Sequence, residues 1–488
     1  MLSISEIGIK KTKRPIKVLQ FGEGNFLRCF VDEMIDIANE KNLFNGNIVI
    51  IKPRETGNVE QFKIQDSLYT VTLRGKQNGV VVDKSRIVSS VEKTLHCLSD
   101  YDEYMNLAKL EDLRFIVSNT TEAGIVFDAD DMYDGLPKTF PGKLTKFLFE
   151  RFKHFKSSKD KGLIILPLEL IENNGTKLKS CVLKFAELWH LPEDFKYWIE
   201  ECNTFCNTLV DRIVTGYPKN NDNSIFEKLG YSDPLLCVGE PYALWVIQCE
   251  KNISDEFPLA KAGLPIVFTD DVDKYRECKV RVLNGAHTSS VLLGYLCGFD
   301  IVRDCVNDVC FGQFMKSCVN DEIVPFVPLE KQEVFSFSND VFERFGNPFI
   351  DHSLLAISLN SVSKWKTRVL PSFKDGFRKY GTCPGKLTLS FAALLAFYRS
   401  TNLREDGLHA KRFNGDEYLV CDDMAVLKFF ADHSRLSAVD YVTAVASNTE
   451  FWGEDLSRYD GFVDQVSQWV DLLDADPIMC VRKVLDKC

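Results

Sequence analysis

The chain has 488 residues, of which 45% are hydrophobic and 26% charged, proportions typical of a globular protein with room for two domains. Its formal net charge of -11 argues against binding to nucleic-acid phosphates or to anionic membranes. The N-terminus lacks the apolar core of a signal peptide, and no apolar run reaches the ~18 residues of a transmembrane helix. We therefore expect a cytoplasmic protein whose partners are small molecules, with no nucleic-acid or membrane partner.

The sixteen cysteines are scattered along the chain without a C-x-x-C pair, and the closest two are Cys202 and Cys206. Without a secretion signal, this pattern favours reduced, mostly buried thiols over disulfides. The seven histidines lie far from one another and from paired cysteines, so a metal site would need ligands from distant segments. We expect no metal site.

A buried strand is expected at residues 16–21, and it runs directly into a glycine-rich turn with Gly22 and Gly24. A helical pattern follows over residues 30–38. Strand, glycine-rich turn and helix together bring backbone N–H groups and a helix N-terminus to a pyrophosphate. Leu27 replaces the third glycine of G-x-G-x-x-G, so the motif is weak alone. Its position after the first strand favours a dinucleotide site.

The second expected strand, residues 47–51, ends in a mixture of charges. In NAD-binding units this strand end usually carries an acid that binds the adenosine ribose. Here the nearest acid is Glu55, and it follows Lys52 and Arg54, which suit a 2′-phosphate instead. The strand end alone therefore leaves NAD and NADP open.

Further buried strands at residues 113–117 and 163–166 alternate with helical patterns at 143–153 and 177–189. This alternation predicts an α/β fold with a largely parallel, doubly wound sheet. After about residue 270 the pattern becomes mainly helical. We therefore expect an N-terminal Rossmann-type domain, residues 1–270, and a mainly α-helical C-terminal domain, residues 271–488.

A helix-compatible run without proline opens the second domain at residues 271–296. At about 100° per residue, Arg276, Lys279, Asn284 and His287 fall within an arc of about 140°. A cation, an amide and an imidazole on one arc can contact one small ligand. Spacing alone favours the alternative, a solvated helix face.

Several longer motifs, in order from residue 16 to about 400, carry a family resemblance. They are Gln20–Arg28, Ser118–Ile125, Leu168–Ile171 with Asn174 and Gly175, Thr208–Pro218, Lys279–His287, Arg344–Pro348 and Thr367–Pro371. Together they resemble the polyol-specific long-chain (mannitol-type) dehydrogenases, and most closely the branch that interconverts tagaturonate and altronate. The resemblance implies a Rossmann-type domain, a helical domain, zinc-independent NAD chemistry, and a monomer or weak oligomer.

By resemblance, Lys279 is the general acid/base, Asn284 polarises the developing oxyanion, and His287 is an orienting hydrogen-bond partner. The residue types agree with this chemistry, because reducing a ketone needs a proton in addition to the hydride that the cofactor supplies. A lysine shielded from water near a cationic nicotinamide can have its pKa lowered toward neutrality. An amide N–H stabilises charge on the carbonyl oxygen.

The resemblance also implies a set of cofactor-binding residues: Gly22, Gly24, Asn25, Phe26, Arg28, Asn119, Glu122 and Asp211. Three of them have a structural alternative. Arg28 can be a helix-surface charge, Glu122 a cap of the next turn, and Asp211 a salt-bridge partner of Arg212.

Two departures from the mannitol enzymes point to an anionic substrate. Those enzymes have a proton-relaying Glu three residues before the lysine, where this chain has Arg276. Their second oxyanion asparagine falls near Leu170, which leaves Asn173 as a weak substitute. An extra cation suits a sugar acid. Among the three cations of residues 364–368, Arg368 is the first candidate to bind its carboxylate and Lys364 the second, with an exposed basic loop as the alternative.

Other functions stay open at this point. Fructuronate reduction and mannitol-type polyol oxidation are close enzymatic alternatives. A nucleotide-sensing protein that keeps the Rossmann domain without catalysis is a more distant one. Lys279, Asn284 and His287 argue against the sensor, since a pure binder does not need an acid/base set.

Overall fold

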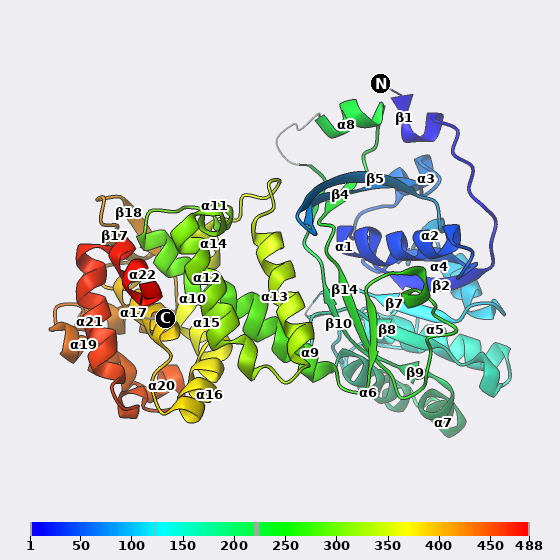
Figure 1. Cartoon of the computed structure of the whole chain (residues 1–488). Coiled ribbons are helices and arrows are strands. Elements are labelled where there is room, and N and C mark those ends of the chain that lie inside the picture. The colour runs from blue at the N-terminus through cyan, green and yellow to red at the C-terminus, as the bar shows by residue number, and fades with distance from the viewer. Residues whose placement is uncertain (1, 122, 219–223, 487–488) are drawn as a thin grey trace. The chain divides into compact units, whose positions relative to one another are not determined.

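The computed structural model describes residues 2–121, 123–218 and 224–486, and the chain divides into two units (Figure 1). The N-terminal unit extends to Val272, except for the short segment Lys76–Val80, which belongs with Asp273–Cys488 in the C-terminal unit. Within the described ranges, no helix is long and apolar enough to cross a membrane.

A six-stranded parallel sheet forms the centre of the N-terminal unit. Its order in space is β6 (Val91–His96), β3 (Asn47–Lys52), β2 (Ile16–Phe21), β7 (Phe115–Ser118), β8 (Ile164–Pro167) and β9 (Thr204–Phe205). Each neighbouring pair with a recorded register is parallel. Counted along the chain this is the order 3-2-1-4-5-6 of a doubly wound dinucleotide-binding sheet. The predicted Rossmann-type fold is confirmed.

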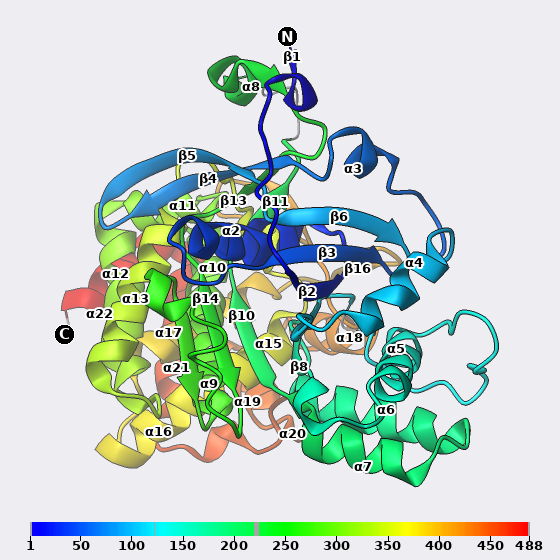
Figure 2. The ribbon, with the colours of Figure 1, turned by 90° about the vertical axis from the view of Figure 1, so that its right-hand side faces the viewer.

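Alternate residues of these strands enter two separate hydrophobic cores. Val18, Ile48 and Val117 face one core together with Met34 of α2 (Glu33–Glu40). The intervening residues face the other core, with side chains of α5 (Phe140–His154) and α6 (Asn174–Leu188). Figures 1 and 2 show α2 on one side of the sheet and α5, α6 and α7 (Glu193–Cys202) on the other. Continuous apolar strands are therefore required here, because both faces are covered.

Shorter elements complete the N-terminal unit. They are α1 (Asn25–Leu27), α3 (Glu60–Ile64), α4 (Tyr101–Asn106), α8 (Ser224–Leu229), β1 (Leu2–Ser3), β4 (Tyr69–Gln77), β5 (Val80–Val88), β10 (Asn207–Asp211), β11 (Val214–Gly216), β12 (Tyr231–Ser232), β13 (Cys237–Gly239), β14 (Leu244–Gln248) and β15 (Ile266–Thr269). Strands β10, β14 and β15 form one small sheet, and β11, β13, β4 and β5 form another. Trp245 of β14 is fully buried against Phe30 and Phe257.

The C-terminal unit is mainly helical. Its helices are α9 (Val272–Cys278), α10 (Gly285–Leu296), α11 (Val302–Asn307), α12 (Val309–Glu322), α13 (Lys331–Phe345), α14 (Leu354–Ile357), α15 (Ser361–Arg368), α16 (Leu370–Tyr380), α17 (Gly385–Phe397), α18 (Met424–His433), α19 (Ala438–Ala446), α20 (Thr449–Trp452), α21 (Phe462–Ala475) and α22 (Pro477–Asp486). The antiparallel strands β16 (Asn402–Arg404), β17 (Gly407–Lys411) and β18 (Glu417–Val420) form its sheet. Helix α17 is mostly apolar and buried on all sides, as expected of a helix at the centre of the core.

Two helical segments are π-helical, with backbone hydrogen bonds that span five residues. One is Arg28–Asp32, between α1 and α2, and the other is Lys279–Asn284, between α9 and α10. The predicted helix over residues 271–296 is therefore present, but its middle is not α-helical. The arc calculated at 100° per residue does not hold across this segment, because a π-helical turn contains more residues than an α-helical one.

A buried polar network surrounds Asp32, the last residue of the N-terminal π-helical segment. The carboxylate of Asp32 is fully buried, and its Oδ2 accepts a hydrogen bond of 2.5 Å from the Tyr69 hydroxyl. Gln20 Nε2 donates to the same oxygen at 3.3 Å and to Gly22 O at 3.1 Å. Burial raises the pKa of Asp32 to about 7.

We predict that Asp32 makes the stability of the protein fall as pH rises. The unfolded carboxyl ionises near pH 4, so between about pH 4 and 7 the folded state binds one proton more and the free energy of unfolding decreases with pH. Asp32→Asn removes this dependence. Between pH 5 and pH 8, the free energy of unfolding of the variant should therefore rise by about 2–3 kcal/mol relative to that of the wild type. Urea unfolding at both pH values measures it. Asp112→Asn, at an exposed position, is the control. The prediction would be contradicted if wild type and Asp32→Asn differed in free energy of unfolding by the same amount at pH 5 and at pH 8.

Candidate functional site

The glycine-rich turn after β2 requires a glycine at its first position. Gly22 has φ +125°, and a Cβ there would lie 3.1 Å from Asn119 O and 3.2 Å from Leu27 Cδ1. The backbone of Asn119 also donates to Phe21 O at 3.2 Å. The ends of β2 and β7 thus approach so closely that a side chain at position 22 would clash. Leu27, in place of a third glycine, packs into this contact.

Gly24 precedes the helix that begins at Asn25, and a Cβ there would meet nothing within 4 Å. Both Gly24 and Asn25 are exposed. Open space in front of a helix N-terminus allows an anion to approach free backbone N–H groups. The geometry of this turn therefore suits a phosphate-containing ligand.

Arg28 supports this turn from within the protein. The side chain is buried, with Nε donating to Glu23 O at 3.1 Å, Nη2 to Asn25 Oδ1 at 2.6 Å and Nη1 to Leu235 O. Its guanidinium also lies over the ring of Tyr69. Arg28 is therefore not the helix-surface charge considered as an alternative. Its hydrogen bonds hold the turn in shape.

Phe26 and Asn25 have separate packing partners. The ring of Phe26 stacks on Phe30, with ring centroids 5.0 Å apart. Asn25 lies against Gly216, where a Cβ would be 2.4 Å from Asn25 Nδ2. The turn is thus packed against β11 as well as against β7.

A cavity of about 550 Å³ opens at the carboxyl ends of β2, β3 and β7, where doubly wound sheets bind their ligands. Its lining includes Gly22, Glu23, Gly24, Arg54, Glu55, Asn119, Thr120, Lys138 and Lys143. Lys52, one of the two cations considered for a 2′-phosphate, forms an ion pair of 2.6 Å with Glu23. Burial lowers the pKa of Lys143.

Glu169, which was not among the predicted site residues, joins the ends of β7 and β8, and Asn119 adds a second link. Asn119 Nδ2 donates to Leu168 O at 2.8 Å. The buried carboxylate of Glu169 accepts from Ser118 Oγ at 3.0 Å and from the Thr120 N–H at 2.9 Å. Burial raises the pKa of Glu169. Glu169 could have been found from the Leu168–Ile171 motif, in which it is the only acidic residue and had no assigned role. Glu122 lies outside the described residues.

Asp211 and Asn173 occupy strand and helix ends. Asp211 is the buried last residue of β10, while its neighbour Arg212 pairs with Glu33 at 2.5 Å. Asn173 precedes α6 with φ +53° and makes no capping hydrogen bond. The next residue, Asn174, joins β8 to β10 instead, because its Nδ2 donates to Pro167 O and its Oδ1 accepts from the Thr208 N–H, both at 2.9 Å.

In the C-terminal unit the π-helical segment brings Lys279 and Asn284 to one side of the helix. The N–H of Gly285 donates to Val280 O, five residues back. Residues five apart therefore lie one turn apart in this segment, as Lys279 and Asn284 do. His287 follows Asn284 by three residues in α10. Lys279 and Asn284 are half-buried, and no hydrogen bond joins the Asn284 side chain to another described residue. The amide is available to a ligand.

His287 is surrounded by basic side chains. Its ring centroid lies 4.1 Å from that of Phe345 and 5.3 Å from that of His352. Its buried Nδ1 has no hydrogen-bond partner among the described residues. Burial lowers the pKa of His287 well below its usual value, and a basic group made up of Arg344, His352, Lys364 and Arg368 lowers it further. The imidazole is therefore neutral at pH 7.

Two members of this basic group were predicted, and they come from one helix. Lys364 Nζ donates to Ile357 O at 2.9 Å, and Arg368 Nη1 lies 3.5 Å from Thr288 Oγ1. Burial lowers the pKa of both side chains. Neither side chain has a carboxylate in salt-bridge contact within the part of the chain that the structure describes. Both lie in α15, so the exposed basic loop is not what the structure shows.

Arg344 and His352 were not predicted as site residues. Arg344 is buried at the end of α13, in the Arg344–Pro348 motif. Arg276, by contrast, forms an ion pair with Asp273. Its charge is therefore compensated locally, whereas the basic group assembles around His287 from α13, α15 and the segment before α14.

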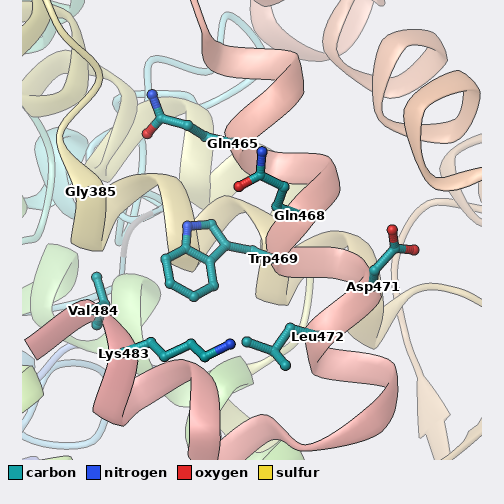
Figure 3. Close-up of a pocket in the computed structure, with 8 residues that line it drawn as sticks. All are labelled: Gly385, Gln465, Gln468, Trp469, Asp471, Leu472, Lys483 and Val484. Carbon is teal, nitrogen blue, oxygen red and sulfur yellow. The ribbon is translucent and has the colours of Figure 1, made fainter. Parts of the chain in front are cut away.

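A second cavity, of about 590 Å³, lies in the C-terminal unit between α17, α21 and α22 (Figure 3). Trp469, Gln465 and Gln468 of α21 and Lys483 of α22 line it. None of the predicted site residues is among its lining. In the described ranges, no group of three or more His, Cys, Asp and Glu side chains is arranged to hold a metal ion.

Comparison with solved structures supports the fold. The chain superimposes on a substrate-free D-sorbitol dehydrogenase with a TM-score of 0.78 and 20% identity, covering 96% of this chain and 95% of the other. For a Pseudomonas fluorescens mannitol 2-dehydrogenase in ternary complex with NAD and D-mannitol, the TM-score is 0.63 at 20% identity, covering 98% and 95%. Both likenesses span nearly the whole chain.

Sequence comparison reaches higher identity. The chain is 41% identical over 473 residues to an altronate oxidoreductase of Enterobacter sp. (strain 638), covering 95% of each. It is 42% identical over 464 residues to an altronate oxidoreductase of Bacillus subtilis (strain 168), covering 94% of this chain and 93% of the relative. The mannitol dehydrogenase Rossmann domain matches residues 16–261, and the mannitol dehydrogenase C-terminal domain matches residues 271–474. The chain therefore belongs to the mannitol dehydrogenase family.

Proposed function

We propose that the protein is an NAD(H)-dependent oxidoreductase that interconverts D-tagaturonate and D-altronate, with a lysine as general acid/base and no metal. The observation that carries the proposal is the identity of 41–42%, over more than nine-tenths of the chain, to relatives named altronate oxidoreductase. The basic group around His287 is independent support, since it suits a substrate with a carboxylate.

The residues of the N-terminal unit fit a dinucleotide. Gly22 lets the ends of β2 and β7 approach closely, Gly24 leaves open space beside a helix N-terminus, and the adjoining cavity is large enough for part of a cofactor. Bound NAD supplies or accepts the hydride. Gly22, Gly24 and Asn119 would hold its phosphates and the adjoining ribose. Lys52 is already paired with Glu23, which leaves Arg54 as the remaining cation for a 2′-phosphate at this strand end.

Lys279 would give a proton to the carbonyl oxygen of the ketose during reduction and take it back during oxidation. The amide N–H of Asn284 would stabilise the negative charge that develops on that oxygen. His287 is neutral, so it can orient a substrate hydroxyl through a hydrogen bond without adding another positive charge.

The carboxylate of the sugar acid would bind to the basic group. Lys364 and Arg368 are half-buried cations, and neither has a carboxylate in salt-bridge contact among the described residues, although Asp422 acts electrostatically on Lys364. An incoming carboxylate would provide the counter-ion. Arg368 can bind both oxygens at once, which makes it the first candidate for the anchor.

Arg368→Ala should raise KM for tagaturonate by about 10- to 100-fold, the cost of losing a hydrogen bond to a charged group. With an uncharged ketose such as fructose as substrate, kcat should stay at the wild-type value. Steady-state kinetics on both substrates measures this split. Lys366→Ala is the matched control, because Lys366 lies on the same helix beside Gly453. Equal losses on both substrates would remove Arg368 as the anchor.

Lys279→Ala should lower kcat by about 10²- to 10⁴-fold, the usual contribution of a positioned acid/base, while NADH affinity barely changes. Stopped-flow turnover and NADH fluorescence titration measure the two quantities separately. Lys274→Ala, at an exposed position in α9, should behave like wild type. A Lys279→Ala variant near the wild-type rate would contradict the assigned role.

The proposed function as a whole is tested by NADH oxidation with tagaturonate, fructuronate and fructose side by side, repeated with NADPH. We expect the highest kcat/KM for tagaturonate with NADH. Preference for fructuronate or fructose would indicate one of the other family activities. NADH binding without turnover of any of them would indicate a nucleotide sensor.

A further inference from the structure

Two cysteines of the N-terminal unit face each other across neighbouring strands. Strands β10 and β14 are antiparallel, with Asn207 opposite Gln248. Cys206 precedes Asn207 and Cys249 follows Gln248. The two cysteines are therefore opposite each other, one residue beyond the last pair of the two strands. Opposed residues of such strands have Cα atoms about 4.5–5.5 Å apart, within the range of about 4.4–6.8 Å that a disulfide spans. Their side chains are also joined by a hydrogen bond.

The two thiols differ in exposure and in acidity. Cys206 is fully buried, whereas Cys249 is only half-buried. The hydrogen bond from the Cys206 thiol raises the pKa of Cys206 and lowers the pKa of Cys249 to about 7. A hydrogen bond from the backbone of Lys251 also lowers the pKa of Cys249, and Glu250 opposes it. The accessible thiol is thus the one that is ionised near neutral pH, as an attacking thiol must be.

We propose that Cys206 and Cys249 are a redox-active dithiol, which a small-molecule disulfide of the glutathione type converts into an intramolecular disulfide. The Cys249 thiolate attacks one sulfur of the oxidant and breaks its S–S bond, and the first glutathione leaves as a thiol. Cys206 then loses its proton and attacks the Cys249 sulfur, releasing the second glutathione. Two protein thiols are oxidised, one disulfide is reduced, and both protons end on glutathione.

The pair lies beside the start of β10, the strand whose last residue is the predicted cofactor-binding Asp211. The backbone of Cys206 packs on Gly175 at the start of α6, where a Cβ would lie 2.2 Å from Cys206 O. Two residues further, Thr208 is bound by Asn174, and β10 then ends at Asp211. A disulfide here ties β10 to β14 at the end of β10 opposite Asp211.

Other cysteines of the same unit provide controls. Cys29 and Cys237 also share a side-chain hydrogen bond, but both are fully buried. Cys237 donates to Asn25 O at 3.2 Å. Cys202 is half-buried like Cys249, and burial raises its pKa. Cys29 and Cys237 therefore control for two thiols that are close together but inaccessible. Cys202 controls for an accessible thiol whose pKa is not lowered.

The test treats the reduced full-length protein with oxidised glutathione at pH 7, blocks free thiols with iodoacetamide, and maps non-reduced peptides by mass spectrometry. We expect a cross-linked peptide that contains Cys206 and Cys249. Cys249 should react about tenfold faster than Cys202, and its rate should fall below pH 7. Cys249→Ser should abolish the cross-link, Cys206→Ser should leave a stable glutathione adduct on Cys249, and Cys202→Ser should change nothing.

Three outcomes would overturn the proposal. They are a persistent glutathione adduct on wild-type Cys249, a disulfide between Cys29 and Cys237 in its place, and full retention of all thiols. If Cys206→Ser does not fold, the wild-type peptide map and its loss in Cys249→Ser still decide the question. The readout is chemical, so it does not depend on the proposed enzymatic function.

Discussion

Both sets of candidate site residues depend on a helix turn that holds more residues than an α-helical turn. On an α-helix, residues five apart point in different directions, but the π-helical register of Lys279–Asn284 brings its two ends toward the same side of the helix. Such a turn needs support from outside the helix. Arg281, in the middle of the segment, is buried and donates to Ser372 Oγ at 3.0 Å and to Asp375 Oδ2 at 2.7 Å. These bonds to α16 hold the wide turn in place.

The second constraint is that charged side chains removed from water need a partner of opposite charge. Lys52, Arg212 and Arg276 each have an acidic partner in contact. Lys364 and Arg368 donate hydrogen bonds to neutral oxygens instead, and the carboxylate of Asp422 acts on Lys364 only electrostatically, without a salt bridge. Because burial also holds His287 neutral, the positive charge of this region comes from Arg344, Lys364 and Arg368. In a protein of net charge -11, such a concentration is a specific feature of the C-terminal unit.

The fold could be predicted from the sequence because buried parallel strands are short apolar runs that end in glycine or polar residues, as residues 16–22 do. The π-helical turn of Lys279–Asn284 could not be predicted, because its residues carry no local signal for it and Arg281 bonds to residues of α16 that are distant in the sequence. Arg344 and His352 were missed for the same reason, since they reach His287 only through tertiary packing. The roles of Lys279, Asn284 and His287 stay predictions.

Arg276 shows why a cation on a predicted helix face is weak evidence for an anionic ligand. It was the residue that first suggested a sugar acid, yet it pairs with Asp273 only three positions away, a contact that α-helical spacing favours. The stronger argument comes from cations whose local sequence offers no acid. Residues 361–371 contain Lys364, Lys366 and Arg368 and no Asp or Glu, so no carboxylate within this stretch is available to pair with them. Asp422, from a distant part of the sequence, acts electrostatically on Lys364 but is not in salt-bridge contact with it, so a substrate carboxylate could still bind these cations directly.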